Sequence, residues 1–64
     1  MIINGKSMKF EDEITIASLL KELNLAQENV VVEVNFQIIS KELYSKQKLY
    51  EADSIEIVSF VGGG

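Results

Sequence analysis

The chain contains 64 residues, with a net charge of −4 and an isoelectric point near 4.6. A chain of this length forms one domain with a small core. The absence of His and Cys excludes an imidazole base, a thiol nucleophile, a disulfide and a Cys/His zinc site. The acidic balance argues against nucleic acid as a partner. Met1–Lys6 lacks the basic region and apolar run of a signal peptide, and no apolar run is long enough to span a bilayer. We therefore expect a monomeric protein of the cytoplasm without a membrane partner.

The first expected element is a β-hairpin. Met1–Asn4 alternates weakly, and Asn4-Gly5 is a strong signal for a two-residue hairpin turn because both residues tolerate a positive φ. Met8–Glu11 alternates clearly and is predicted to be the second strand. We interpret the acidic run Glu11–Glu13 as a solvated turn, since a cation site would need more converging oxygen ligands.

A short amphipathic helix is expected next. Thr15 is a candidate N-cap, and Asn24 is a reasonable terminator. The apolar residues that recur at i, i+3, i+4 and i+7 are Ile16, Leu19, Leu20 and Leu23. Ser18, Lys21 and Glu22 face away from this apolar stripe. A helix of two to three turns is marginal alone in water, so the stripe is interpreted as core that lies on a sheet.

The following segment predicts an interior strand and a short edge strand. Val30–Asn35 is the most β-branched stretch of the chain. Because Glu33 must face water, Val32 and Val34 are expected to face the helix, and Val31 to share the face of Glu33. Asn35–Gln37 is expected to turn the chain into an edge strand at Ile38–Ile39.

Lys41–Tyr50 shows no sustained period. Lys41–Tyr44 could form a single helical turn with Leu43 as its packing anchor. Glu51–Asp53 is expected to be a turn that leads into the last strand.

The last strand is predicted at Ser54–Phe60. Its alternation places Ile55 and Ile57 in the core and leaves Val58 and Phe60 exposed on the side of Glu56. If this strand neighbours Val30–Asn35, Val31 extends the same apolar patch, which is typical of a docking surface. The alternative for Phe60 is that its ring folds over the sheet edge and caps the core.

Val61-Gly62-Gly63-Gly64 follows the last strand without a polar linker. Fully extended, these four residues reach roughly 13–14 Å, and glycines could thread a narrow tunnel that a Cβ would block. We interpret the α-carboxylate of Gly64 as the functional group, which the rest of the domain presents to partner proteins. The alternative is a terminal stretch that is simply not ordered.

The order of elements predicts an α+β fold in which a mixed sheet of four to five strands grips one α-helix, the β-grasp (ubiquitin-like) arrangement. We assign residues 1–61 to this domain and residues 62–64 to a flexible C-terminal tail. The chain carries no enzyme motif and no ATP motif, so an enzyme that activates the terminal carboxylate must be a separate partner. Adenylation of that carboxylate would give it a good leaving group for attack by a thiol, a persulfide or an amine.

The chain resembles the ThiS family, the ubiquitin-like sulfur carriers of thiamine thiazole biosynthesis. The resemblance covers essentially the whole length, and the segments that carry it are Ile3–Lys6, Thr15–Leu23, Val32–Asn35 and, most specifically, Asp53–Gly64. Departures from the family pattern are Phe36 in place of glycine or a polar residue, Ser40-Lys41 in place of Pro-Arg, and Ala52 in place of glycine.

This resemblance implies a function. An E1-like enzyme, ThiF, would adenylate the Gly64 carboxylate with MgATP, and sulfur from a cysteine-desulfurase persulfide would convert it to a thiocarboxylate. The thiazole synthase ThiG would then receive the sulfur. Gly63 and Gly64 match the terminal pair of the family, Gly62 is less restricted, and all three would enter partner active sites. Val58 and Phe60 match the outward positions that meet partners. The chain itself would bind no cofactor and would not be a catalyst.

Three alternatives remain at this stage. The first is the small subunit of molybdopterin synthase, with the same fold and tail chemistry. The second is a ubiquitin-like modifier joined through Gly64 to lysines of target proteins. The third is a β-grasp binding module whose tail has no chemical role.

Overall fold

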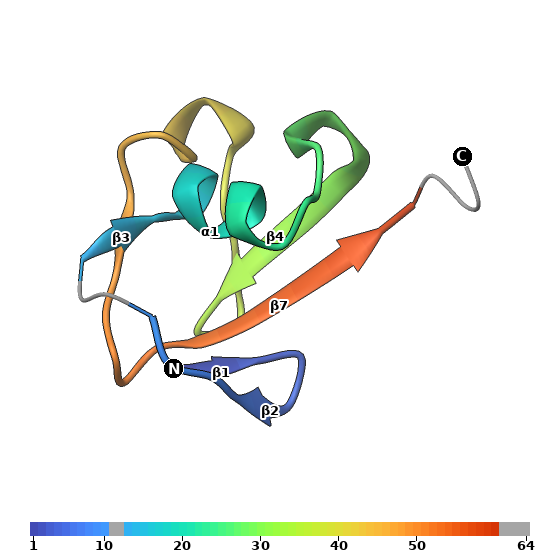
Figure 1. Cartoon of the computed structure of the whole chain (residues 1–64). Coiled ribbons are helices and arrows are strands. Elements are labelled where there is room, and N and C mark those ends of the chain that lie inside the picture. The colour runs from blue at the N-terminus through green and yellow to red at the C-terminus, as the bar shows by residue number, and fades with distance from the viewer. Residues whose placement is uncertain (11–12, 61–64) are drawn as a thin grey trace.

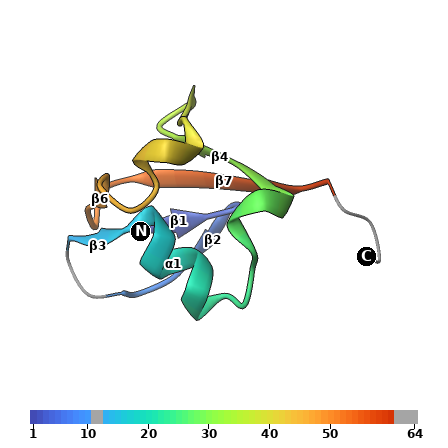
Figure 2. The same cartoon turned by 90° about the horizontal axis from the view of Figure 1, so that it is seen from above.

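The computed structural model describes residues 1–10 and 13–60 of the chain. A five-stranded mixed sheet with the strand order β2-β1-β7-β4-β5 carries the single α-helix of this part of the chain, α1, on one face (Figures 1 and 2). The strands of this sheet are β1 (Ile2–Ile3), β2 (Lys6–Ser7), β4 (Val30–Val34), β5 (Gln37–Ile38) and β7 (Ser54–Ser59). This arrangement confirms the predicted β-grasp fold.

The first hairpin is shorter than predicted. Its turn residues Asn4 and Gly5 have φ values of 51° and 82°, as a two-residue turn of this kind requires. Such a turn pairs Ile3 directly with Lys6, so β2 begins at once after the turn. The prediction of a second strand at Met8–Glu11 was therefore wrong for Met8–Phe10, and Glu11 lies outside the described residues. Asp12 of the expected acidic turn also lies outside them, whereas Glu13 is exposed.

Helix α1 (Ile16–Glu22) begins and ends as predicted. The Thr15 hydroxyl accepts a hydrogen bond of 3.1 Å from the Ser18 amide. At the other end Asn24 adopts a φ of 60°, the left-handed conformation that commonly follows a helix. The amide of Leu25 donates to the carbonyl of Leu20 at 2.9 Å, which satisfies one of the last carbonyl groups of the helix. The fully buried side chains of the stripe are those of Ile16, Leu19 and Leu20, and Leu23 is partly buried.

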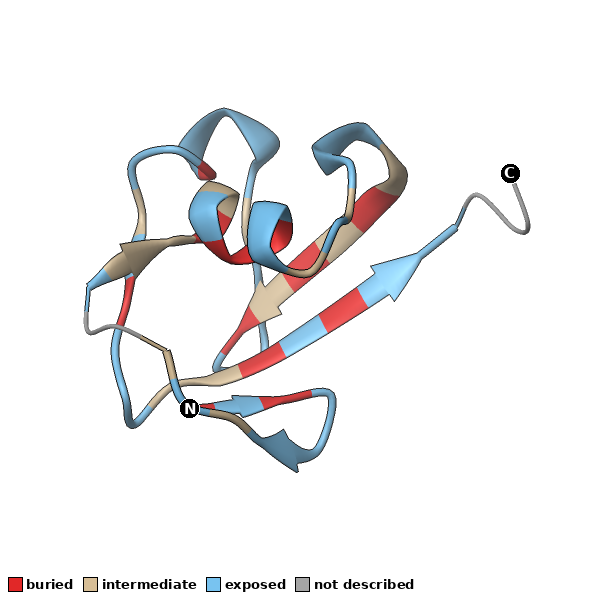
Figure 3. Cartoon of the chain, in the orientation of Figure 1, coloured by how far each residue is buried: buried red, intermediate tan, exposed pale blue. Residues whose placement is uncertain are grey.

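Strands β4 and β7 form the centre of the sheet. They are antiparallel, with a register that runs from Val30 opposite Ser59 to Val34 opposite Ile55. Burial alternates along both strands, and Figure 3 shows this alternation most clearly along β7. As predicted, Val32 and Val34 are buried on the helix side. β7 also pairs in parallel with β1, so its other neighbour is the first strand of the chain.

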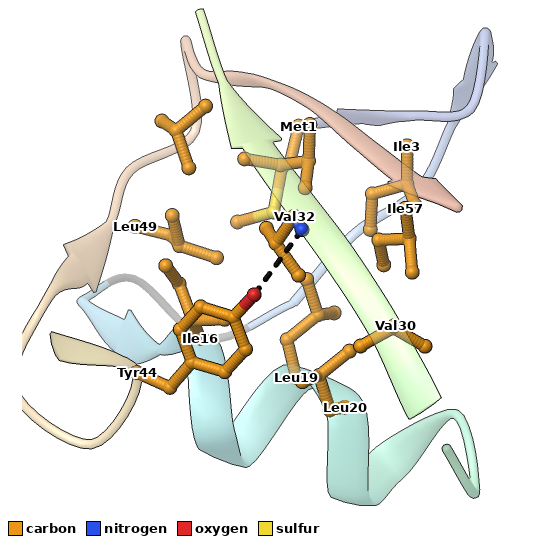
Figure 4. Close-up of a cluster of buried hydrophobic side chains, with 12 residues drawn as sticks. Met1, Ile3, Ile16, Leu19, Leu20, Val30, Val32, Tyr44, Leu49 and Ile57 are labelled. Carbon is orange, nitrogen blue, oxygen red and sulfur yellow. Dashed lines mark hydrogen bonds between the residues drawn. The ribbon is translucent and has the colours of Figure 1, made fainter. Parts of the chain in front are cut away.

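The segment after β4 differs from the prediction in its anchor residue. Strand β5 lies at the sheet edge at Gln37–Ile38, one residue earlier than expected, and a short 3₁₀ helix follows at Lys41–Leu43. Leu43 is 42% exposed, whereas the neighbouring Tyr44 is 1% exposed, so the prediction of Leu43 as anchor was wrong. Tyr44 is the buried anchor of this segment, and its hydroxyl accepts a hydrogen bond of 3.2 Å from the amide of Val32 (Figure 4).

Two strands of the structure were not predicted. β3 (Ile14–Thr15) and β6 (Lys48–Leu49) form a separate antiparallel pair. With two residues each, they are too short to show a period in the sequence. The core lies between α1, the sheet and this pair, and its buried side chains are Met1, Ile3, Ile16, Leu19, Leu20, Val30, Val32, Val34, Tyr44, Leu49, Ile55 and Ile57.

Candidate functional site

Strand β7 precedes the glycines that the sequence predicts to be functional. It occupies the middle of the five-stranded sheet, between β1 and β4. The amide of Phe60 donates to the carbonyl of Asn29 at 3.1 Å, so backbone pairing continues one residue past the end of β7. The predicted tail residues Gly62, Gly63 and Gly64 lie outside the described residues. The structure therefore describes the base of the tail, where the last strand leaves the sheet.

Two asparagine side chains hold β7 by its backbone. Asn4 accepts from the amide of Ile57 at 2.7 Å and donates to the carbonyl of the same residue at 3.2 Å. Asn35 accepts from the amide of Ser54 at 3.0 Å and donates to the Asp53 carboxylate at 3.0 Å. Both asparagines sit in hairpin turns with φ values of 51°. Sequence reasoning identified these asparagines as turn residues and missed their second role, which brings together positions up to 53 residues apart.

The predicted outward residues lie together on the sheet face opposite α1. Val58 and Phe60 are 53% and 57% exposed, and Val31 lies directly opposite Val58 in the register of β4 and β7. The placement predicted for these residues is confirmed, while their role in docking stays a prediction. Phe60 is not among the buried core residues, so the alternative in which its ring caps the core does not hold.

The same face continues over β4 to the sheet edge. Ile38 of β5 lies opposite Glu33 and is 71% exposed, and Glu33 in turn lies opposite Glu56. We call this surface the outer face and define it by Val31, Glu33, Ile38, Glu56, Val58 and Phe60.

Lys41 contacts the aromatic ring of Phe60, the last residue that the structure describes. Its ammonium group lies 5.3 Å from the centroid of the Phe60 ring, within the range of a cation–π interaction. The same group donates a hydrogen bond of 3.0 Å to the carbonyl of Glu28. Sequence reasoning gave Lys41 no role, because nothing in a pattern along the chain connects it with residue 60.

The part of the chain that the structure describes shows no cluster of metal ligands. In residues 1–10 and 13–60 no group of three or more Asp or Glu side chains is placed to hold a metal ion. A shallow hollow of about 460 Å³ lies beside α1, with Lys21 and Glu28 as its charged lining residues, and β7 contributes nothing to it. Among the helices that the structure describes, none combines the length and apolar character needed to cross a membrane.

Fold and site together define a class of protein: a β-grasp domain whose last strand lies in the middle of its sheet and whose outer face carries exposed apolar side chains. The comparisons with known proteins specify the class further. The ThiS family model matches residues 1–64, and the chain belongs to this family.

Relatives support this assignment. The chain is 48% identical over 63 residues to the sulfur carrier protein ThiS of Bacillus subtilis, with 97% of this chain and 96% of that protein covered. It is 38% identical over 64 residues to a thiazole synthase of Paramagnetospirillum magneticum, where it covers 100% of its own length and 20% of that protein. The chain thus spans about a fifth of that relative.

A solved structure has the same fold. The crystal structure of the thiamine biosynthesis protein ThiS from Geobacter metallireducens superposes with a TM-score of 0.79 at 30% sequence identity, covering 98% of this chain and 96% of that one.

Proposed function

We propose that this chain is a sulfur carrier of thiamine biosynthesis and that the carboxyl group of Gly64 is the atom group that carries the sulfur. The observation that carries the proposal is the match of the ThiS family model through residue 64, which includes the terminal glycines. The sequence offers no Cys or His with which the domain could hold or activate sulfur itself. Family membership does not favour the alternative roles as a molybdopterin synthase subunit, a protein modifier or a binding module.

The proposed chemistry begins with activation by another protein. A carboxylate anion resists nucleophiles, so an E1-like adenylating enzyme of the ThiF type joins the Gly64 carboxylate to AMP from MgATP and releases pyrophosphate. The terminal sulfur of a persulfide, supplied by a cysteine desulfurase, attacks the acyl carbon and AMP leaves. A second thiol then cleaves the S–S bond, which forms a disulfide between the two thiols and leaves the thiocarboxylate on Gly64. MgATP is bound by the activating enzyme, and the carrier holds no cofactor.

The thiocarboxylate is then delivered to a thiazole synthase of the ThiG type. Relatives in which a segment like this chain forms part of a thiazole synthase support this partner. Gly62, Gly63 and Gly64 would enter the active site, because residues without Cβ pass through a narrow channel. Val31, Val58 and Phe60 would contact the partner surface around its entrance. We expect these steps to take place in the cytoplasm.

The test is loading of the intact protein. The chain is incubated with an E1-like adenylating enzyme, MgATP, a cysteine desulfurase and cysteine, and its mass is measured. We expect a gain equal to the replacement of one oxygen by sulfur. Deletion of Gly64, or addition of one residue after it, should abolish the gain without a change in the thermal unfolding of the domain.

A variant that changes Gly62 but keeps the length of the tail and its terminal Gly63-Gly64 pair serves as the matched control. Gly62→Ala adds one Cβ away from the terminus and should reduce loading less than the addition of a residue after Gly64. Loading that persists when the terminus is blocked by an added residue would show that the Gly64 carboxyl group is not the acceptor.

A further inference from the structure

The outer face places two carboxylates beside its apolar residues. Glu33 and Glu56 lie directly opposite each other on β4 and β7, and the Cβ atoms of such a pair are about 4.5–5.5 Å apart. The next pair on the same face toward the end of β7 is Val31 and Val58. Ile38 lies on the other side of Glu33. The carboxylate pair therefore has apolar neighbours on two sides, along the strands at Val31 and Val58 and across β4 at Ile38.

The described part of the chain does not neutralise this pair. The ion pair found in residues 1–10 and 13–60 joins Lys48 to Glu13, and neither belongs to the outer face. Like charges directly opposite each other in a sheet are destabilising. Glu33 is also half-buried, which keeps part of its side chain from water. In the described residues the two carboxylates thus face each other without an ion-pair partner, next to exposed apolar side chains.

A partner that covers the apolar residues must also cover the carboxylates. Residues at i and i+2 of a strand are about 7 Å apart, so any surface that contacts Val31 and Val58 lies over Glu33 and Glu56 as well. Removing two unpaired anions from water is costly unless a cation accompanies them. An arginine meets this need best, because its guanidinium carries five donors in a planar fork and can bond two carboxylates at once.

We propose that the thiazole synthase docks on the outer face and inserts one arginine between Glu33 and Glu56, with apolar side chains over Val31, Ile38 and Val58. This inference rests on the proposed carrier function. The thiazole synthase is the assigned occupant because relatives of this chain hold a similar segment and a thiazole synthase in one protein. The arginine fixes the orientation of the carrier, since a carboxylate pair of defined spacing accepts it in one position.

Neutralisation of the carboxylate pair tests this contact. Binding of the double variant Glu33→Gln/Glu56→Gln to the purified thiazole synthase of the same organism is measured by calorimetry at low and high NaCl. The dissociation constant should rise about tenfold to hundredfold, as expected for loss of hydrogen bonds to charged groups. Its dependence on salt should weaken relative to the unmodified chain.

The matched control is Glu22→Gln/Glu51→Gln, which removes the same net charge from exposed positions outside the outer face. Its dissociation constant should stay within about twofold of that of the unmodified chain, because exposed charges away from the contact are screened. The outer-face variant should unfold at a temperature no lower than the unmodified chain, since it loses a repulsion. A reduced affinity therefore reports the interface and not the fold.

Three outcomes would overturn the inference. One is equal or tighter binding by the outer-face variant, and another is an equal loss in the control. The third is a loss confined to the adenylating enzyme, which would place the arginine on that enzyme instead. In each case the unmodified chain would still acquire sulfur in the mass assay, so the carrier function would stand. A chain that neither binds the synthase nor acquires sulfur would contradict both.

Discussion

At the scale of single residues, backbone conformation and side-chain hydrogen bonds meet in the asparagines of the turns. Asn4 is the clearest case, because its left-handed backbone directs its amide group at both polar groups of Ile57. An asparagine tolerates this conformation better than most residues. The middle of β7 is therefore held by a residue near the start of the chain.

Replacement of Asn4 by glycine separates these two contributions. Glycine keeps the φ of 51° but removes both hydrogen bonds to Ile57. We expect the free energy of unfolding to fall by about 1–3 kcal/mol, at roughly 0.5–1.5 kcal/mol for each bond. Urea denaturation measures the difference.

Asn24→Gly is the control for this variant. Asn24 has a φ of 60°, and within the described residues its side chain makes no hydrogen bond. Its replacement should change the stability by only a few tenths of a kcal/mol. An equal loss in both variants would mean that the Asn4 side-chain bonds contribute nothing.

At Phe36 the backbone is also left-handed, but the side chain contributes little to the stability of the fold. Phe36 occupies the second position of the β4–β5 turn with a φ of 70°, where the corresponding position of the first hairpin is Gly5 with a φ of 82°. Its ring is 86% exposed and gains little from packing. Phe36→Gly should stabilise the domain by about 1 kcal/mol, because a side chain in the left-handed region costs roughly 1–2 kcal/mol.

Two further variants show whether the backbone conformation at residue 36 causes this change in stability. Phe36→Ala removes the ring and keeps the strained backbone, so its stability should match that of the unmodified chain. Gly5→Ala adds a Cβ where no heavy atom lies within 4 Å, so it should lose stability through its backbone conformation alone. A Phe36→Gly variant that is less stable in thermal unfolding would show that the ring has a structural role.

At the scale of elements, the predictions succeeded where a pattern is long and local. Helix α1 has a full apolar stripe, an N-cap at Thr15 and a terminator at Asn24, and each of these signals lies within the helix or next to it. In β7 burial alternates from Ile55 to Val58, as the sequence pattern predicts. The two-residue strands β3 and β6 could not be found in this way, because their pairing of Ile14 with Leu49 depends on the tertiary fold.

The same reasoning explains which part of the candidate site was predictable. The outward positions of Val58 and Phe60 follow from alternation around Glu56. The contact of Lys41 with Phe60 joins two segments that alternation does not relate, and it was missed.

Strand β4 is longer than its edge neighbour β5, and a side chain from another segment bonds to the part of β4 that β5 does not cover. Beyond Ile38 the edge strand ends, and the amide of Val32 bonds to the hydroxyl of Tyr44 instead of to a strand carbonyl. Tyr44→Phe leaves this buried amide without a partner. We expect a loss of about 1–3 kcal/mol in the free energy of unfolding, the cost of a buried unsatisfied donor.

Tyr50→Phe provides the comparison, because Tyr50 is 48% exposed and can lose its hydroxyl at little cost. Denaturation curves of both variants measure the difference. If Tyr44→Phe were as stable as Tyr50→Phe, the hydrogen bond to Val32 would not contribute to stability.

At the scale of the whole molecule, β7 joins the beginning and the end of the domain. It pairs with β1 on one side and with β4 on the other, so it cannot detach without opening both. We expect the amide of Ile57, which is bonded to Asn4, to exchange with solvent deuterium only through global unfolding.

Native-state hydrogen exchange measured by NMR tests this expectation. The opening free energy at Ile57 should equal the free energy of unfolding from denaturation, whereas amides of the short edge strand β5 should open more easily. A lower opening free energy at Ile57 than at the edge would mean that β7 opens independently of the rest of the domain.

The parallel pairing of β1 with β7 has a practical consequence. Ile2 donates a hydrogen bond of 3.1 Å to the carbonyl of Asp53, just ahead of β7, whereas Phe60 follows the far end of that strand. A dye, a purification tag or a surface linker attached ahead of Met1 would thus sit a full strand length away from Phe60 (Figure 1). Immobilisation through the amino end keeps the opposite end accessible to enzymes in solution.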